Sequence, residues 1–482
     1  MSMRDRNYHT TMDPKKTDGK HLENMSKAMN KAREYIILLM TYFLYKLIRF
    51  VVLTFQKFTW AVTGVERTRK DAKSGLMFKQ SAHVQHIFWR RKLITSTVSD
   101  PTDFITTHKY FKHPNYVLKP TVSLYCITKE EAVFVELNEK VNLYRLDSNN
   151  NVELFYAKQF ENAHSLITMP LACFHKIAQD LGKPKIPIIC ISSTGHCGAT
   201  LLCRVLGQLP GMIVVNEPDA FTSLAFLNKS NVFGKGEYEQ LLPSAMRLLC
   251  KPDDRAGIFL VKTRPCCTCQ MEDIYRYFPQ MYQIFVYRNS LKTVSSSLNI
   301  FAKEPITMVG KYFIDNKILS TIFPCFRWTL YRYFCQVLAR ENDSTEAKAF
   351  SSVGIFTLAW AANVSRCLDH VDSRVPLIPV LYEDMMKSPR KTCAVLFDIL
   401  ELRPEYIATA MEGFRITTNN TVQSSGTAMS DSRKSIPHEF RTEADAILKR
   451  YGLPKLGERF EIPGVLDFET NKFNRMTRDR IF

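Results

Sequence analysis

A short apolar run near the middle of the chain ends in a glycine-containing turn that leads into a helical pattern. The run is "IPIICIS", and "STGHCGATLL" follows it, with a helix expected to start near Gly198. Backbone N–H groups that point out of such a turn attract anions such as phosphate and sulfate. Thr194, Ala199 and Thr200 are placed to add backbone or hydroxyl donors. Because no Lys-Ser or Lys-Thr pair follows the glycine, the stretch lacks the GxxxxGK[ST] motif of nucleotide triphosphatases.

A second candidate is Arg288, at the end of the run "YQIFVY", with Ser296 eight residues later in a helical pattern. The planar guanidinium of arginine can grip a phosphate, and a serine hydroxyl can add a donor. A surface ion pair is the alternative role for Arg288. A third run ends at "YEDMMKSP", where the polar side chains of 382–384 are expected to be mainly structural.

These polar residues follow short apolar runs that alternate with helical patterns. Such alternation predicts an α/β fold with a parallel sheet that helices cover on both faces. In that fold, ligands bind beyond the carboxyl ends of the strands. The runs are "IPIICIS", "GMIVVNEP", "GIFLVKTRP", "YQIFVYRN" and "VPLIPVLYED".

The three motifs, in this order, resemble the sulfotransferase family, which uses 3′-phosphoadenosine 5′-phosphosulfate. "GHCGATLL" aligns with the family's 5′-phosphosulfate loop P-K-S-G-T-T-x-L, and Arg288 with Ser296 matches its 3′-phosphate motif. "YEDMMKSPRKTCAVLFDILEL" is similar to the family's Y-E-D-[LM]-x-x-x-P segment. The resemblance covers residues 184–470. It implies a P-loop-like, three-layer domain over that range, with the phosphosulfate donor as a co-substrate and no metal.

The resemblance also implies site residues. The donor-binding loop would comprise Thr194, Gly195, His196, Cys197, Gly198, Ala199 and Thr200. His196 stands where the family has a lysine, and its imidazole, with an unperturbed pKa near ~6.5, would be only partly charged at neutral pH. Lys262 matches a lysine of many sulfotransferases and could assist catalysis as a cation. Arg264 stands where cytosolic members have a base histidine, but an arginine cannot accept a proton.

Glu217, in "IVVNEPDAF", resembles the glutamate of the E-P segment in Golgi-type carbohydrate and tyrosine sulfotransferases. A partly desolvated carboxylate there could accept a hydroxyl proton. A structural or acceptor-binding role, and loss of the base altogether, remain open. Arg433 and Lys434 lie in a Gly- and Ser-containing stretch that is a candidate for the family's basic loop over the donor, or is simply a mobile loop.

Composition narrows the partners. The chain has 482 residues, 45% of them hydrophobic, and a formal charge of +18, so its surface should attract anionic membranes, phosphates or glycans. Taken together with the resemblance to sulfotransferases, this charge does not lead us to expect a nucleic-acid partner. The 13 cysteines fit a reducing compartment slightly better than an oxidising one. The group at 266–269 lacks a second CxxC or a His pair, so no metal site is expected.

The N-terminal region divides into three predicted parts. Residues 1–34 are expected to be a polar, disordered tail, and residues 80–180 a β-rich region. Residues 35–64 form an apolar helix in which Lys46, Arg49 and Lys57 fall within roughly an 80° arc at about 100° per residue. An interfacial helix with these cations among anionic headgroups, a short signal-anchor, and a helix packed on the protein all remain open.

The sequence therefore predicts a membrane-associated sulfotransferase that transfers a sulfuryl group to a hydroxyl of a carbohydrate, tyrosine or lipid. A Golgi membrane is the expected location, with the cytoplasmic surface of a membrane as the alternative. A catalytically inactive relative that still binds a nucleotide or glycan is the competing interpretation, because His196 and Arg264 both replace family catalytic residues.

Overall fold

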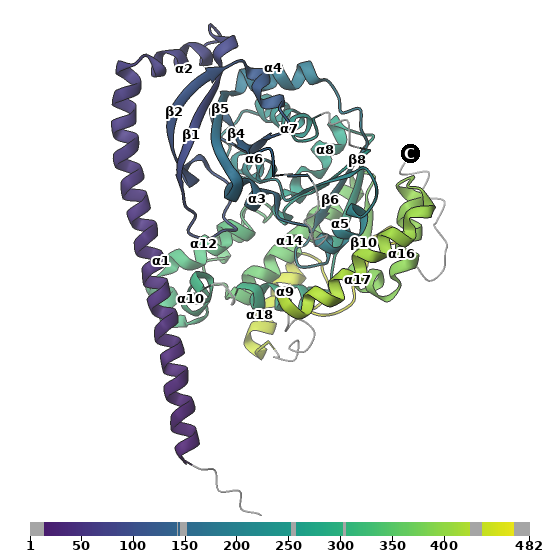
Figure 1. Ribbon diagram of the computed structural model, residues 1–482. Coiled ribbons are helices and arrows are strands. Elements are labelled where there is room, and N and C mark those ends of the chain that lie inside the picture. Colours follow the sequence, from purple (N-terminus) through teal and green to yellow (C-terminus); the bar gives the residue numbers. More distant parts are fainter. Residues whose placement is uncertain are drawn as a thin grey trace, which may run out of the picture.

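The chain forms two five-stranded sheets with helices around them, and one long helix along one side (Figure 1). The computed structural model describes residues 14–141, 143–144, 152–251, 257–301, 305–424 and 436–466. The helices not introduced below are α2 (Val65–Lys73), α4 (Leu171–Leu181), α8 (Met271–Tyr277), α13 (Asp343–Glu346) and α18 (His438–Arg450).

The first sheet, sheet A, is antiparallel and lies within the range predicted to be β-rich. Its strand order is β2-β1-β5-β4-β3. Almost every residue of β3 and β4 is buried. The apolar side chains of these strands belong to the core that sheet A shares with the helices between it and the second sheet. The strands are β1 (Ala82–Arg90), β2 (Phe104–Lys112), β3 (Val122–Ile127), β4 (Glu131–Leu137) and β5 (Ala163–Pro170).

Within the range predicted to be β-rich, the residue types of "VELFYAKQF" favour a strand, and "DSNNN" at 147–151 favours a hairpin turn before it. The strand prediction is wrong, because the segment contains helix α3 (Phe155–Asn162). Its buried residues Phe155, Tyr156 and Gln159 have a helical spacing, and Gln159 donates hydrogen bonds to Ser123 Oγ at 2.7 Å and to the Leu124 carbonyl at 2.9 Å. Packing of these side chains on sheet A therefore favours the helix. The predicted turn lies outside the described residues.

The second sheet, sheet B, is parallel, and its strands are the five predicted apolar runs. The predicted α/β class is thus confirmed. The order is β10-β9-β6-β8-β7, so the chain leaves β6 toward β7 and β8 on one side and later returns to β9 and β10 on the other. The strand order reverses at β6, which makes its carboxyl end the expected ligand site. The strands are β6 (Ile188–Ser193), β7 (Met212–Asn216), β8 (Ile258–Lys262), β9 (Tyr282–Tyr287) and β10 (Ile378–Leu381).

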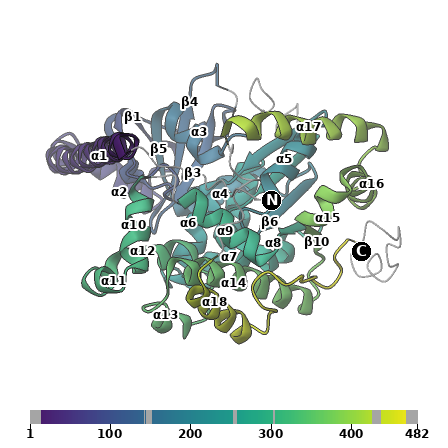
Figure 2. The same ribbon diagram turned by 90° about the horizontal axis from the view of Figure 1, so that it is seen from below.

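Helices cover both faces of sheet B (Figure 2). One face packs on α5 (Ala199–Gly207), α16 (Pro389–Ile399) and α17 (Ile407–Ser424). On the other face, α6 (Asp219–Lys229) and α7 (Lys235–Leu249) share one apolar core with sheet A. Helices α9 (Ser290–Phe301) and α14 (Ser352–Asp372) pack against each other beside that core. The two sheets are consequently parts of one packed body.

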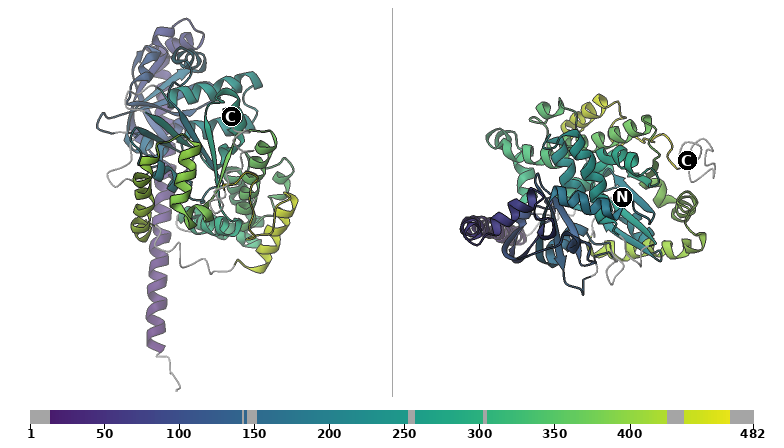
Figure 3. Two further views of the ribbon diagram at one scale, coloured as in Figure 1. Left: turned by 90° about the vertical axis from the view of Figure 1, so that its right-hand side faces the viewer. Right: turned by 90° about the horizontal axis from the view of Figure 1, so that it is seen from above.

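Helix α1 runs along sheet A and continues past the rest of the chain (Figures 1 and 3). It comprises Pro14–Val62, so it begins within the stretch predicted to be a disordered tail. Residues Ile36–Val62 are long and apolar enough to cross a membrane. Two of the three cations of the predicted stripe contact the protein: Lys46 Nζ donates to Thr102 Oγ1 at 3.4 Å and Arg49 Nε to the Phe104 carbonyl at 3.3 Å. Lys57 is exposed. Helix α1 is therefore packed on sheet A, which was one of the predicted alternatives, and contact with lipid headgroups stays a prediction.

Candidate active site

The turn after β6 is held open by glycines and by two contacts to β9. Gly195 and Gly198 have φ of 78° and 85°, and a Cβ on Gly198 would lie 2.4 Å from the Tyr382 ring. Only glycine allows both this conformation and this close approach. The Thr194 N–H and the Cys197 thiol both donate to the Val286 carbonyl, at 3.2 and 3.0 Å. The turn is thereby fixed to β9 at the point where the strand order reverses.

The same turn presents free donors. None of the described residues accepts a hydrogen bond from the backbone N–H groups of His196, Cys197 or Gly198. The Thr194 hydroxyl is buried and has no partner among the described residues. These donors precede the N-terminus of α5, whose dipole also favours an anion. The predicted loop residues 194–200 therefore form a cradle that fits a phosphate or sulfate group.

Arg288 is brought to this cradle. Its Nη1 donates to the His196 carbonyl at 3.3 Å, and its guanidinium lies 4.7 Å from the centre of the Tyr382 ring. Glu383 lies within ion-pair distance of both Arg288 (4.0 Å) and Lys292 (3.4 Å). A pocket of about 160 Å³ lies beside Arg288 and includes Lys292 and Glu383 in its lining.

Ser296 lies in α9, the helix that follows Arg288, but is not bonded to Arg288. The serine lies in the second turn of α9 and is half-buried, and no hydrogen bond joins it to Arg288 or to another described residue. Arg433 and Lys434, predicted to cover the donor, lie outside the described residues. Arg288 is thus the one residue of the predicted 3′-phosphate motif that reaches the loop.

Lys262 and Glu217 form a buried pair on neighbouring strand ends. Lys262 Nζ donates to Glu217 Oε1, and both side chains are largely shielded from solvent. Burial acts to raise the pKa of Glu217, but Lys262 and Arg264 together outweigh it and lower the pKa below its usual value. Glu217 is therefore a carboxylate at neutral pH, with one oxygen occupied by Lys262.

The backbone at this site is strained. His196 has φ 47° and Glu217 has φ 60°, in the left-handed region that side-chain-bearing residues avoid. The Glu217 N–H donates to the Lys262 carbonyl at 2.7 Å, which fixes the strained residue to β8. Such conformations persist where the surrounding structure imposes them, and they concentrate at functional sites. Both residues had been singled out from the sequence.

The protein around His196 favours the neutral form of its imidazole. The pKa of the imidazole is lowered to about 4: loss of water is the largest cause, Glu217 acts to raise the pKa, and Lys262 and Arg288 act to lower it. The side chain is nevertheless exposed at the loop. A partly protonated imidazole therefore stays a prediction, and Lys262 and Arg288 are the other cations at the cradle.

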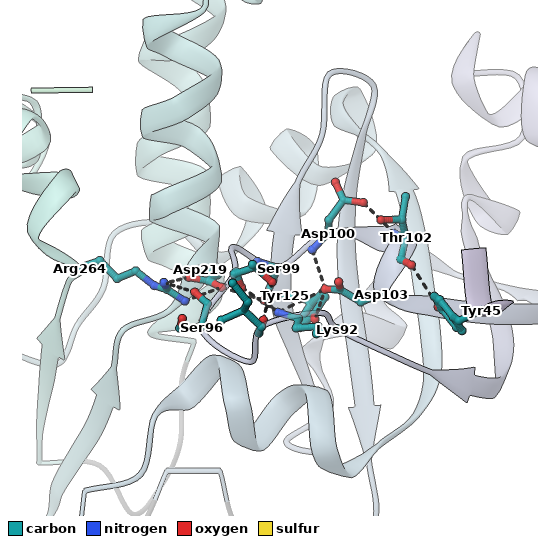
Figure 4. Close-up of polar contacts among 12 residues, drawn as sticks. Tyr45, Lys92, Ser96, Ser99, Asp100, Thr102, Asp103, Tyr125, Asp219 and Arg264 are labelled. Carbon is teal, nitrogen blue, oxygen red and sulfur yellow. Dashed lines mark hydrogen bonds and ion pairs between the residues drawn. The ribbon is translucent and has the colours of Figure 1, made fainter. Parts of the chain in front are cut away.

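Arg264 is part of a buried structural network (Figure 4). Its guanidinium pairs with Asp219, at 2.8 Å from Nε, and donates to the Ser96 carbonyl and the Tyr333 hydroxyl, both at 2.7 Å. Asp219 also accepts hydrogen bonds from the N–H and hydroxyl of Ser99 at 2.8 and 2.9 Å. Arg264 thus ties sheet B to the loop between β1 and β2.

The network continues through that loop to α1 (Figure 4). Lys92 lies 3.5 Å from the Ser99 hydroxyl and 3.3 Å from Asp103, whose carboxylate also binds Tyr125. The Asp100 N–H donates to the Asp103 carboxylate, and the Thr102 N–H donates to the Asp100 carboxylate. The Tyr45 hydroxyl of α1 in turn donates to the Thr102 carbonyl at 3.1 Å. A continuous set of polar contacts therefore joins α1 to the candidate site.

Sequence reasoning missed the partners of Arg264. Asp219 is fully buried, although it is one of the most solvent-seeking residue types, and it directly follows the Glu-Pro pair at the start of α6. The position of Asp219 at a helix N-terminus was the only feature of the sequence that could have drawn attention to it. No local pattern pointed to Ser96 or Tyr333 as partners of Arg264, because they come from segments far away in the sequence.

The cysteines of the group at 266–269 and Trp360 have structural contacts. Cys266 and Cys267 are buried in the core between the sheets, and Trp360 is buried with its Nε1 donating to the Arg288 carbonyl at 3.0 Å. Across the described part of the chain, no group of three or more His, Cys, Asp or Glu side chains is arranged to hold a metal.

Of the comparisons with known proteins, only the one with solved structures finds similar chains. No family model and no curated protein matches the chain. A sulfotransferase from Alicyclobacillus acidocaldarius is 14% identical, with 55% of this chain and 92% of that chain covered and a TM-score of 0.32. The sulfotransferase STF9 from Mycobacterium avium is 11% identical, with 59% and 83% covered and a TM-score of 0.35. The sulfotransferase domain of the Synechococcus PCC 7002 olefin synthase is 14% identical, with 56% and 96% covered and a TM-score of 0.31.

Proposed function

We propose that the chain is a sulfotransferase that moves a sulfuryl group from 3′-phosphoadenosine 5′-phosphosulfate to a hydroxyl acceptor. One observation carries this proposal. Where the strand order of sheet B reverses, an anion cradle, Arg288 from β9 and the Lys262–Glu217 pair converge. Transfer between two oxygen atoms requires alignment, stabilisation of charge on the leaving phosphate, and removal of the acceptor proton, and these groups can meet each need.

The cradle would hold the donor. Backbone N–H groups of residues 195–198, with the hydroxyls of Thr194 and Thr200, would bind the 5′-phosphosulfate end. Arg288 and Ser296 would bind the 3′-phosphate, and the pocket of about 160 Å³ beside Arg288, which Lys292 also lines, supports the part of Arg288 in this assignment. Arg433 and Lys434 are retained as candidates for the covering loop. The nucleotide is a co-substrate, and no step requires a metal.

Lys262 and Glu217 would perform the transfer together. A donor phosphate attracts Lys262 away from Glu217, which frees a carboxylate beside the acceptor. The acceptor hydroxyl then attacks sulfur: the new oxygen–sulfur bond forms, the bond from sulfur to the phosphate oxygen breaks, and the proton passes to Glu217. Lys262 stabilises the negative charge left on the phosphate. The products are the sulfate ester and 3′-phosphoadenosine 5′-phosphate.

His196 is expected to contribute little charge to this step. The variant His196→Asn should keep the wild-type dependence of turnover on pH between about pH 6 and pH 8, because the surroundings of His196 lower the pKa of its imidazole and favour the neutral ring. Asn also tolerates the left-handed backbone of this position. His196→Lys should raise turnover, since it adds a permanent cation beside the leaving phosphate. A loss of the acidic limb of the pH profile in His196→Asn would contradict this assignment.

The competing function is that of a silent binder. Glu217 is held as a low-pKa carboxylate by Lys262, and Arg264 fills a base position with a residue that cannot accept a proton. A chain that binds the nucleotide or an anionic glycan through the cradle, without transfer, would have the same fold. This alternative differs from the enzyme only in what happens after binding.

A single experiment separates the two functions. The full-length protein is incubated with sulfur-labelled donor and a panel of glycans, tyrosine peptides and sterols, and binding of 3′-phosphoadenosine 5′-phosphate is measured in parallel. We expect label in at least one acceptor. Nucleotide binding without label in any acceptor would identify the silent binder, and absence of both would reject the donor site itself.

Location follows from the apolar helix. One described helix is long and apolar enough to cross a membrane, and we propose a membrane-associated protein at the Golgi, with the cytoplasmic surface of a membrane as the alternative. Asn228 and Asn342 are exposed and lie in glycosylation sequons. Attached glycans at either residue would place the domain in the secretory lumen.

A further inference from the structure

Helix α1 has two faces of opposite character. Tyr45 is fully buried, and Lys46, Arg49 and Gln56 donate hydrogen bonds to β2 or to the residues just before it. The opposite face carries large apolar side chains that are exposed to solvent. They are Ile36, Ile37, Leu39, Met40, Phe43, Leu44, Leu47, Phe50, Val51, Phe55, Phe58 and Val62.

This apolar face is too wide for a helix partner. At about 100° per residue, the exposed side chains cover an arc of roughly 160°, whereas a coiled-coil seam uses only the narrow stripe of two positions in seven. Only 6% of the most apolar window of α1 is buried inside the protein. Water-exposed apolar surface of this extent marks a site that a membrane or another protein covers.

A second apolar patch lies beside α1. Helices α10 (Pro305–Asp315), α11 (Lys317–Ile322) and α12 (Pro324–Phe334) lie on the same side of the molecule as α1, and α10 contacts α1 (Figure 2). Their exposed apolar and aromatic side chains are Met308, Val309, Tyr312, Ile318, Ile322, Phe323 and Trp328. Tyr and Trp are enriched where a protein meets the boundary between lipid and water. The two patches together form the α1/α10–α12 face.

The contacts of α1 with sheet A argue against a simple membrane span. Gln56, in the apolar segment, donates to the Thr106 carbonyl at 2.9 Å, and Arg49 donates to Phe104. If α1 crossed the bilayer, strand β2 at the edge of sheet A would lie at the depth of the lipid tails. Unpaired backbone groups of an edge strand cannot be satisfied there. Helix α1 therefore cannot keep these contacts with sheet A and span a bilayer at the same time.

We propose that the α1/α10–α12 face inserts into the interface of an anionic bilayer, with α1 parallel to the membrane plane. The formal charge of +18 adds attraction to anionic headgroups, while the apolar side chains supply the insertion. Of the three cations of α1 that suggested headgroup contact, Lys46 and Arg49 bind residues at or just before the start of β2, and Lys57 is exposed. This surface does not depend on the proposed transfer reaction.

The native Cys325 provides a direct probe. It lies in α12 within the face, and among the described cysteines it is the exposed one. The full-length protein is labelled there with an environment-sensitive fluorophore and mixed with vesicles of phosphatidylcholine, with or without phosphatidylserine. We expect a blue shift of the emission that is larger with phosphatidylserine.

Variants test the same face. The double substitution Ile318→Glu and Ile322→Glu should lower vesicle binding by about tenfold or more, because each removes an inserted side chain and adds a charge. Met386→Glu is the matched control, since Met386 is also exposed but lies on α15 (Tyr382–Lys387), on the other side of the molecule (Figure 2). Both sites are exposed, so the melting temperature should stay close to that of the wild type.

Two outcomes would overturn the proposal. Vesicle binding without a change in the Cys325 probe would mean that α1 enters the bilayer alone, as a span. A dimer in the absence of vesicles, made monomeric by the Ile318 and Ile322 variants while vesicle binding is unchanged, would assign the face to a second copy of the chain. A protein that binds no vesicles at all would also refute it, whatever its transfer activity.

Discussion

Replacing Lys262 by Ala is expected to lower the rate of sulfuryl transfer by about 10²–10³-fold. Lys262 is the buried cation at the end of β8, and its side chain is 5% exposed. Charge stabilisation by a fixed group in a water-poor site is worth far more than in water, so no other group replaces it easily. Single-turnover transfer from labelled donor measures the change, and calorimetry with 3′-phosphoadenosine 5′-phosphate measures binding separately.

Lys251→Ala is the matched control for this variant. Lys251 is also a buried lysine, but its ammonium binds backbone carbonyls of the β3 region, including that of Val117 at 3.0 Å, away from the cradle. It should lose stability and keep the transfer rate of its folded fraction. Transfer by Lys262→Ala at the wild-type rate would contradict the assigned role.

Glu217→Gln separates the two members of the pair. If Glu217 accepts the acceptor proton, this variant loses transfer while nucleotide binding stays close to that of the wild type. If Glu217 only holds Lys262 in place, the freed lysine strengthens nucleotide binding and transfer continues. The pattern of binding against turnover therefore identifies the role of the carboxylate.

The largest loss of stability is expected from Asp219→Ala. It should lower the free energy of unfolding by about 3–5 kcal/mol, because it leaves the buried Arg264 guanidinium without its carboxylate. The Ser99 N–H and hydroxyl also lose their acceptor, so the loop between β1 and β2 loses its tie to sheet B. Denaturant unfolding, followed by circular dichroism, measures the difference.

Two further variants sharpen the stability prediction. Glu272→Ala removes one of the three carboxylates near the exposed Arg276, at 3.2 Å, and should cost only about 0–1 kcal/mol. The double variant Asp219→Leu with Arg264→Met replaces both charges by apolar groups and should recover much of the loss. Equal losses from Asp219→Ala and Glu272→Ala would show that the buried pair contributes no more than a surface one.

The strands of sheet B and the turn after β6 were predictable because their signals are local. A parallel strand buried on both faces must be apolar throughout, and each of the five runs showed this in its own residues. The loop likewise revealed itself through its glycines and the apolar helix that follows. Arg288, Lys262 and Glu217 were identifiable because each directly follows such a run.

The helical state of residues 155–162 was not predictable in the same way. Its aromatic and β-compatible residues favour a strand locally, and only the fully buried Gln159, with its partners on β3, fixes the helix. The partners of Lys46 and Arg49 on α1 were also not predictable, because they too come from a distant segment of the chain. A stripe of cations on a helix indicates a polar partner, but whether that partner is a lipid headgroup or the carbonyls of β2 depends on where sheet A lies.

By itself the sequence determined the α/β class, the five strands, the glycine-containing turn after β6 and the residue types at the strand ends. The tertiary structure alone decided which of those residues meet. Lys262 pairs with Glu217 because β8 lies beside β7, and Arg288 reaches the loop because β9 lies on the other side of β6. Strand order depends on the packing of segments far apart in the chain, so no local pattern encodes it. The same long-range packing sets the surroundings that lower the pKa of His196, which a residue type alone does not reveal.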